Sequence, residues 1–242
     1  MPPPPKIKTF HEAGQRLTLR DLGSHVELMF DKAPILTSAS LGTERVFGQL
    51  AGSFRLPAKP RILIGGLGFG STLVGVLGAV GRDAEVIVVE KLATVIALLR
   101  GELAYLAPGV LDDPRVRLVN DDVTKVLARE RDLDVILLDV DNGPGWASFR
   151  SNERLYGAKG LETARTALRP GGAYAVWSGY PADAFLKDLR RAGFEASVVP
   201  LRERGKVRAR AYIGERAAAP ERARPKGLTA TARASRRSPR RS

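Results

Sequence analysis

The sequence has no cysteine and only two histidines, His11 and His25, both near the N-terminus. The absence of cysteine excludes disulfides, thiolate zinc sites and cysteine nucleophiles. The two histidines do not have metal-ligand spacing, so we expect neither a histidine metal centre nor a histidine-containing catalytic triad. The opening MPPPPK also lacks the apolar core of a signal peptide, and the prediction is a cytoplasmic protein that binds no metal.

One long run lacks charge altogether. Ile62–Gly81 has the length of a membrane-spanning helix, but seven of its residues are glycine, and four of those crowd into Gly65–Gly70. A buried strand, a tight glycine turn and a buried helix explain this run better than a membrane span does. We therefore expect no membrane segment.

Acidic residues are scarce in the C-terminal tail. Of the net charge of +13, residues 216–242 carry +8 and the other residues +5. The tail has few large apolar side chains, so it is expected to be disordered. It either contacts nucleic acid or another acidic surface, or is a solvated segment with no specific role. It contains no aromatic residue that would stack on bases.

Composition and turn signals divide the chain into four parts. The second part has short alternating apolar patterns typical of β-hairpins, and Pro57 and Pro60 mark its junction with the third part. The predicted parts are a flexible N-terminus (1–15), a small β region (16–58), a larger Rossmann-like domain (59–215) and the basic tail (216–242).

Strands and helices alternate through the third part, and its strands are almost entirely apolar. Such strands are typical of a parallel sheet covered by helices on both faces. A closing antiparallel hairpin follows, with strands at Glu195–Leu201 and Val207–Gly214. The predicted fold is α/β: a doubly wound, mostly parallel seven-stranded sheet with the layout of an AdoMet-dependent methyltransferase. The five preceding strands are expected at 61–65, 85–90, 116–120, 134–139 and 173–178, and the helices near 71–80, 92–106, 123–129, 152–168 and 182–192.

Ligands of open α/β sheets bind beyond the carboxyl ends of the strands, and two features there indicate a nucleoside. Gly66, Gly68 and Gly70 form a turn after the first strand, which lets the backbone approach a ligand closely. Ser71 stands where a dinucleotide fingerprint needs Gly or Ala, which disfavours NAD. Glu90 ends the second strand, where a carboxylate accepts hydrogen bonds from both ribose hydroxyls. The alternative for the glycines is a turn needed only for packing, and the alternative for Glu90 is a helix cap.

Carboxylates also follow the third and fourth strands. Asp122 and its neighbour Val123 are placed to meet an adenine, although Asp is equally a common helix cap. Asp139 ends the central strand beside the glycine turn, where it can orient or deprotonate an amine. Asp141 and Asn142 follow in an Asn-Gly-Pro turn, so their roles are either turn formation or contact with the acceptor.

These features, in this order, resemble the spermidine synthase (polyamine aminopropyltransferase) family between Leu17 and Gly214. The motifs that carry the resemblance are GGLGFGSTL, VVE, DPRVRLVNDDV, LDVILLDVDNGP, NERLY and LRPGGAYAVWS. The resemblance implies that Glu90 binds ribose, Asp122 contacts adenine and Asp139 is catalytic. It also implies that Tyr156 lies on a loop over the acceptor.

The chain departs from the family pattern where the amines bind. Phe69 replaces a loop Asp that holds the donor's propylamine, and Asn142 replaces the second Asp of a D-x-x-D pair. Trp177 replaces a Gln after the fifth strand. A Tyr-His-Glu gate run becomes the segment Phe47–Gln49. The nucleoside half of the site is thus retained, while the amine half is rewritten.

The sequence therefore predicts a transferase that alkylates an amine-type small molecule from an adenosyl sulfonium, either decarboxylated AdoMet or AdoMet, with Asp139 as base or orienter. The family resemblance favours aminopropyl transfer, whereas the substitutions favour methyl transfer. A non-catalytic nucleoside-binding protein whose basic tail binds nucleic acid is a second hypothesis, and an NAD-dependent oxidoreductase is a disfavoured third. A homodimer is kept as one of the open oligomeric states.

Overall fold

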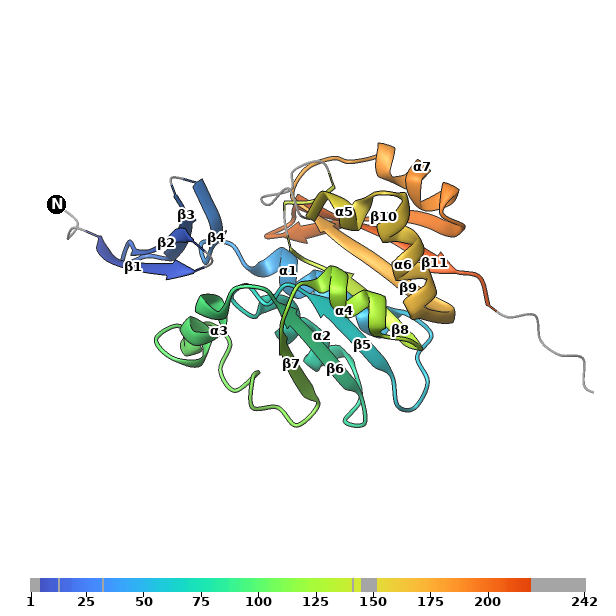
Figure 1. Cartoon of the computed structure of the whole chain (residues 1–242), viewed down its shortest axis with the longest axis horizontal. Coiled ribbons are helices and arrows are strands. Elements are labelled where there is room, and N and C mark those ends of the chain that lie inside the picture. The colour runs from blue at the N-terminus through green and yellow to red at the C-terminus, as the bar shows by residue number, and fades with distance from the viewer. Residues whose placement is uncertain (1–4, 13, 32, 141, 145–151, 219–242) are drawn as a thin grey trace, which may run out of the picture.

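The computed structural model describes residues 5–12, 14–31, 33–140, 142–144 and 152–218. They form a four-stranded antiparallel sheet at the N-terminal end and a larger α/β unit (Figure 1). The strands of the small sheet pair in chain order, β1 (Lys6–Glu12), β2 (Gln15–Asp21), β3 (Val26–Phe30) and β4 (Ala33–Thr37). Asp141 and residues 219–242, which include most of the basic tail, lie outside the described residues.

The larger sheet has seven strands in the order β10-β11-β9-β8-β5-β6-β7, and it confirms the predicted fold class. Five strands pair in parallel and β11 and β10 add an antiparallel hairpin at one edge. The strand order changes direction between β5 and β8, which is where such sheets bind ligands. The bounds are β5 (Arg61–Gly65), β6 (Glu85–Glu90), β7 (Val116–Asn120), β8 (Leu133–Leu138), β9 (Leu168–Ser178), β10 (Phe194–Glu203) and β11 (Lys206–Arg216).

Helices cover both faces of the larger sheet because alternate strand residues are apolar on both sides. Ile62 and Ile64 face a core shared with α1, α2 and α3, whereas Leu63 faces a core shared with α4 to α7. The bounds are α1 (Gly42–Gln49), α2 (Ser71–Ala79), α3 (Ala93–Arg100), α4 (Val123–Arg129), α5 (Glu153–Tyr156), α6 (Ala158–Ala167) and α7 (Ala184–Arg191), with 3-10 turns η1 (Leu50–Ser53) and η2 (Ala104–Leu106). Among the described helices, none is long and apolar enough to cross a membrane.

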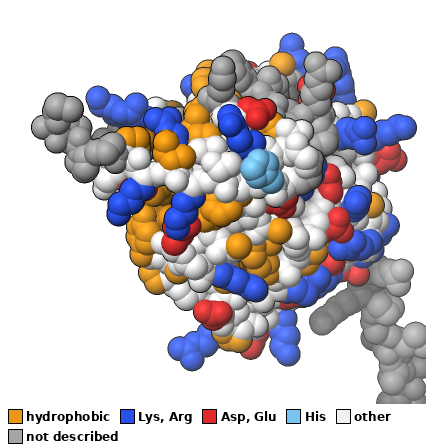
Figure 2. Space-filling model, turned by 60° about the vertical axis from the view of Figure 1, so that its left-hand side comes forward, with side chains coloured by type: hydrophobic (Ala, Val, Ile, Leu, Met, Phe, Trp, Pro, Cys, Tyr) orange, Lys and Arg blue, Asp and Glu red, His pale blue; other side chains and the backbone are white. Residues whose placement is uncertain are grey.

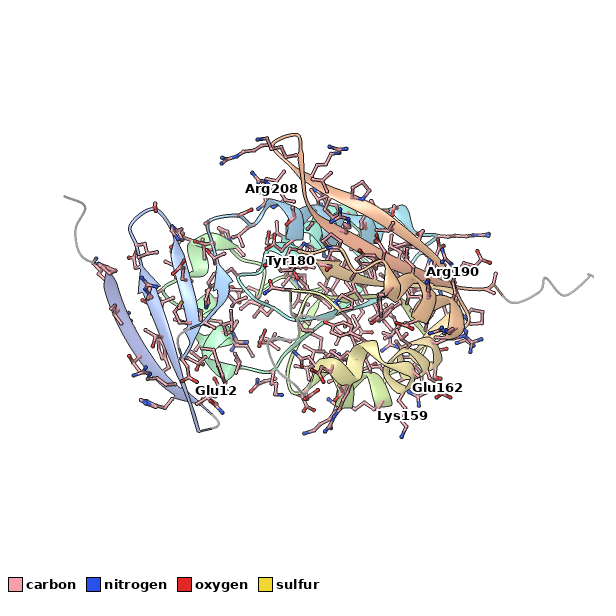
Figure 3. All side chains as sticks on the ribbon, turned by 90° about the horizontal axis from the view of Figure 1, so that it is seen from above. Glu12, Lys159, Glu162, Tyr180, Arg190 and Arg208 are labelled. Atoms are coloured by element: carbon pink, nitrogen blue, oxygen red, sulfur yellow. The ribbon has the colours of Figure 1, made fainter. Side chains whose placement is uncertain are left out.

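The small sheet is attached to the larger unit through Glu12 of β1. Its carboxylate accepts hydrogen bonds from the backbone amides of Ala93 and Thr94, at 2.6 and 2.9 Å, and so caps the N-terminus of α3 (Figure 3). Leu17 and Leu28 of the small sheet are fully buried in the same core as α1 and α2. The small sheet therefore forms one wall of the site described below.

The structure corrects several predicted boundaries. β1 lies within residues 1–15, for which the sequence predicts flexibility, because its backbone pairs with β2 although its side chains are mostly exposed. The helix predicted over 152–168 is two helices, α5 and α6, separated at Gly157. β9 begins at Leu168, five residues before the predicted start. The sequence patterns do not predict helix α1, because its sequence, GTERVFGQ, is short and contains two glycines, which have low helix propensity.

Candidate functional site

Two pockets open at the carboxyl ends of β5, β6 and β8, and they share Asp139 as part of a common wall. The first pocket lies beside the glycine turn and the ends of β6 and β7. The second pocket lies between the glycine turn, α1 and the end of β9. Ile35, Leu36, Gly68 and Val140 complete the shared wall, so β4 of the small sheet contributes to both pockets.

The glycine turn brings β5 close to Asp139. The Gly66 amide donates to the carbonyl of Val89, and the Asp139 amide donates to the carbonyl of Gly65, each at 2.8 Å. Gly66 has φ +94°, and a Cβ there would lie 2.2 Å from the carbonyl oxygen of Asp139. Only glycine fits this position without displacing the backbone that carries Asp139. Gly68 lines both pockets, whereas Gly70 packs against Ala107 and lines neither.

Glu90 lies at the floor of the first pocket and is almost fully buried. One of its carboxylate oxygens accepts from the Leu67 amide at 2.9 Å and the other from the Leu92 amide at 2.8 Å. Burial raises the pKa of Glu90, and the backbone donors around it oppose that rise. The donors are the amides of Leu92, Leu67, Gly68 and Lys91, and the carboxylate lines the first pocket, where a ligand can reach it.

Asp122 has the helix-capping role that the sequence left as its alternative. One of its oxygens accepts from the Thr124 amide at 2.9 Å and from the Thr124 hydroxyl at 2.7 Å, which caps α4. The other oxygen receives Lys91 Nζ at 3.3 Å. Burial raises the pKa of Asp122, but these hydrogen bonds outweigh it and the net shift is downward. Asp122 and Val123 also line the first pocket, so capping does not exclude ligand contact.

Asp139 follows β8, and its carboxylate accepts a hydrogen bond from Thr72 Oγ1 at 2.5 Å. Burial and the nearby carboxylate of Glu44 raise the pKa of Asp139 to about 7, and the Thr72 hydrogen bond opposes this rise. A carboxyl group with this pKa exchanges a proton readily near neutral pH. The prediction that Asp139 lies beside the glycine turn is therefore confirmed, and its chemical role stays a prediction.

The second pocket contains residues that sequence reasoning missed. Glu44 of α1 and Thr72 of α2 line it together with Asp139, and Arg208 of β11 lines it from the closing hairpin (Figure 3). Glu44 escaped notice because α1 itself was not predicted. In the sequence, Glu44 is a single Glu in GTERVFGQ, with no motif around it that marks a binding residue. Asn152, which lines the first pocket, was also missed.

The predicted acceptor residues have different outcomes. Asn142 and Trp177 line the second pocket, and the indole nitrogen of Trp177 is buried without a hydrogen-bond partner among the described residues. Tyr156 lines neither pocket: it is 8% exposed and packs edge-on against Phe185, at 6.0 Å between ring centroids. Its predicted position over the acceptor stays a prediction. Asp141 lies outside the described residues.

Comparisons with known proteins agree with the geometry. No protein-family model matches the chain. Polyamine aminopropyltransferase 2 of Pseudomonas aeruginosa is 37% identical over 125 residues, which cover 49% of this chain and 33% of that protein. The match thus spans only about a third of the relative's length. It confirms the resemblance inferred from the sequence motifs.

Solved structures share the fold. A spermidine synthase in complex with the transition state analogue AdoDATO has a TM-score of 0.68 at 19% identity, covering 89% of this chain and 74% of that chain. The spermidine synthase of Thermotoga maritima has a TM-score of 0.67 at 19% identity, covering 87% of this chain and 72% of that chain. The N-terminal sheet followed by the seven-stranded sheet is therefore an arrangement found in known structures.

Proposed function

We propose that this chain, which is spermidine synthase-like in sequence and fold, transfers an aminopropyl group from decarboxylated AdoMet to an amine. The observation that carries the proposal is the position of Asp139 in the wall between two pockets. One pocket is suited to a nucleoside and the other to a cationic amine. A transferase needs such an arrangement because its two substrates must meet at one point.

The first pocket supports the assignment of the donor nucleoside. The Glu90 carboxylate lines this pocket and would accept from the ribose hydroxyls, and Gly66 and Gly68 leave the adjoining backbone open to a ligand. Asp122 also lines this pocket and, in the proposal, accepts a hydrogen bond from the adenine amino group. Apolar walls, which suit a flat base, are provided by the side chains of Ile35, Val89, Leu92 and Val95.

In the proposed reaction, the lone pair of the acceptor nitrogen forms a bond to the propyl carbon attached to the sulfonium sulfur. The carbon–sulfur bond breaks, and its electron pair stays on sulfur, which leaves as a neutral thioether, methylthioadenosine. The nitrogen then carries one proton too many, and Asp139 accepts it in its carboxylate form. The enzyme's contribution is mainly positioning and proton removal.

The test is a product assay with the whole chain. Incubation with decarboxylated AdoMet and a panel of aliphatic mono-, di- and triamines should release methylthioadenosine and an amine enlarged by one aminopropyl group, both detected by mass spectrometry. The control is Asp139→Asn, which should keep nucleoside binding and lose turnover. If no amine yields methylthioadenosine above the Asp139→Asn background, the proposed function is wrong.

Methyl transfer from intact AdoMet is the second candidate, and Phe69 favours it. Phe69 is 5% exposed and lines the second pocket, where the family has an acid for the donor's propylamine. The same assay with AdoMet distinguishes the two reactions, since methyl transfer releases S-adenosylhomocysteine.

Nucleic-acid binding has no comparable support on the face shown in Figure 2. The Lys and Arg side chains on that face are scattered among apolar and acidic ones.

A further inference from the structure

We propose that Glu44 is a substrate-binding residue that supplies the second carboxylate for a primary ammonium group in the second pocket. This inference rests on the proposed function and deepens it. Asn142, at the position where the family has the second acid, cannot provide a negative charge. Glu44 reaches the same pocket from α1, a different part of the chain.

The surroundings of Glu44 fit a carboxylate that awaits a cation. Thr43 Oγ1 donates to one of its oxygens at 2.9 Å, and no Lys or Arg among the described residues forms an ion pair with it. Glu44 is half-buried, and its carboxylate interacts with that of Asp139 across the pocket. Two carboxylates that share a pocket repel each other, and an ammonium group between them removes the repulsion.

A close helix crossing holds Glu44 in place. A Cβ on Gly48 of α1 would lie 2.1 Å from the Thr72 carbonyl of α2, and one on Gly75 would lie 2.2 Å from the Arg45 carbonyl. Thr72 Oγ1 lies 3.2 Å from the Glu44 carbonyl and 2.5 Å from the Asp139 carboxylate, so it links the two acidic residues. Glycine at positions 48 and 75 therefore lets the two helices approach this closely.

Burial, together with the carboxylate of Glu203 on β10, raises the pKa of Glu44. Ser40 holds Glu203 through a hydrogen bond. Arg208 lines the pocket from β11, and it is exposed. Of the charged side chains that line the second pocket, Arg208 is the one cation among the described residues, so a bound ammonium would meet two carboxylates, Glu44 and Asp139.

The ammonium group has two candidate sources. One is the acceptor amine, and the other is the propylamine of decarboxylated AdoMet, for which Phe69 offers no charge. Both have the same chemistry, a primary ammonium on an alkyl chain. Binding measurements with separate probes distinguish them because methylthioadenosine has the nucleoside without the propylamine.

The experiment is titration calorimetry on the wild type, Glu44→Gln and the control Glu195→Gln. Glu195 is an exposed residue of β10 outside both pockets, so its substitution makes the same change in charge elsewhere. The probes are methylthioadenosine, decarboxylated AdoMet, and 1,4-diaminobutane added to the methylthioadenosine complex. Circular dichroism verifies that each variant is folded.

We expect Glu44→Gln to bind methylthioadenosine as the control does and to lose at least about tenfold in affinity for one ammonium probe. If the affinity for decarboxylated AdoMet falls, Glu44 binds the donor's propylamine. If the affinity for 1,4-diaminobutane falls, Glu44 binds the acceptor amine. In the latter case Asn142→Asp added to Glu44→Gln should restore binding. Unchanged affinity for both probes overturns the role of Glu44 and leaves the proposed function standing, whereas a wild type that binds no methylthioadenosine overturns both.

Discussion

The hydroxyl of Thr72 lies 2.5 Å from the carboxylate of Asp139 and 3.2 Å from the carbonyl oxygen of Glu44. A hydroxyl has one proton to donate, and both neighbours are acceptors. When Asp139 is ionised, the hydroxyl donates to its carboxylate; when Asp139 is protonated, its proton can go to Thr72 Oγ1 and the Thr72 proton to the Glu44 carbonyl. Burial and the Glu44 carboxylate raise the pKa of Asp139 to about 7, and the Thr72 hydrogen bond opposes this rise. Thr72 therefore joins the side chain of Asp139 to the backbone of Glu44 in either protonation state of Asp139.

Asp139→Asn should stabilise the protein while abolishing turnover. The pKa of Asp139 rises from its ordinary value of 3.8 to about 7 on folding, so the folded state binds the proton more tightly and stability falls as pH increases through that window. The substitution removes this penalty, of the order of 2 kcal/mol at pH 8 after allowance for water in the pockets. Thermal melts at pH 4 and pH 8 measure it, with a gain expected only at pH 8.

The turnover rate of the wild type should increase with pH, whereas its stability decreases. The acceptor's proton goes to the Asp139 carboxylate, so the rate should rise with pH through about 7 as that carboxylate forms. An Asp139→Asn variant that keeps the wild-type rate, or that melts no higher at pH 8, would remove Asp139 from the proposed role.

Gly66→Ala should damage the site strongly. A Cβ at this position would lie 2.2 Å from the Asp139 carbonyl, and the backbone has φ +94°, which alanine adopts only with strain. We expect a loss of about 2–4 kcal/mol in the free energy of unfolding and no detectable nucleoside binding. Urea unfolding and calorimetry with methylthioadenosine measure the two effects.

Gly78→Ala is the matched control for this substitution. Gly78 lies in α2, and a Cβ added there would have no atom within 4 Å, so the variant should gain up to about 1 kcal/mol from the better helix propensity of alanine. If Gly66→Ala and Gly78→Ala had the same free energy of unfolding and the same affinity for methylthioadenosine, the turn would not require glycine at position 66.

The two roles of Asp122 can be separated by substitution. Asn caps helices about as well as Asp, so Asp122→Asn should keep the stability of α4, whereas Asp122→Ala should lose about 1 kcal/mol. If the carboxylate also contacts adenine, both variants should bind methylthioadenosine about tenfold more weakly. Calorimetry and thermal melts together decide the matter, and an Asp122→Asn variant with undiminished affinity would leave only the cap.

Arg208 should limit the affinity for amines. It lines the second pocket with no hydrogen-bond or ion-pair partner among the described residues, and its charge repels an approaching ammonium group. Arg208→Met keeps an apolar chain and removes the charge, so KM for 1,4-diaminobutane should fall about two- to fivefold, with a smaller dependence on salt. A KM that rises instead would indicate that Arg208 binds the acceptor, through a negatively charged group.

Much of the fold is predictable because its signals are local. The parallel strands are continuous apolar runs, and the turns between them contain glycine, so the order of elements and the closing hairpin could be inferred from sequence. The positions of Glu90 and Asp139 followed from the same rule, since ligands bind where these strands end. β1 and α1 were missed because they are held by pairing with β2 and packing on α2, contacts that no local pattern encodes.

The acceptor side of the site was less predictable for the same reason. Glu44 and Arg208 come from α1 and β11, and only the folded chain brings them to Asp139. Tyr156 packs against Phe185, and its predicted position over the acceptor stays a prediction. The residues at strand ends lie where the sequence predicted them, and their roles toward a ligand stay predictions.

The most direct test of the central claim is a comparison of donor affinities by titration calorimetry. The second pocket presents the carboxylates of Asp139 and Glu44, which attract the propylamine of decarboxylated AdoMet and repel the additional carboxylate of AdoMet. We predict that decarboxylated AdoMet binds at least about tenfold more tightly than AdoMet, and more tightly than methylthioadenosine. Equal or weaker binding of decarboxylated AdoMet than of AdoMet would contradict aminopropyl transfer.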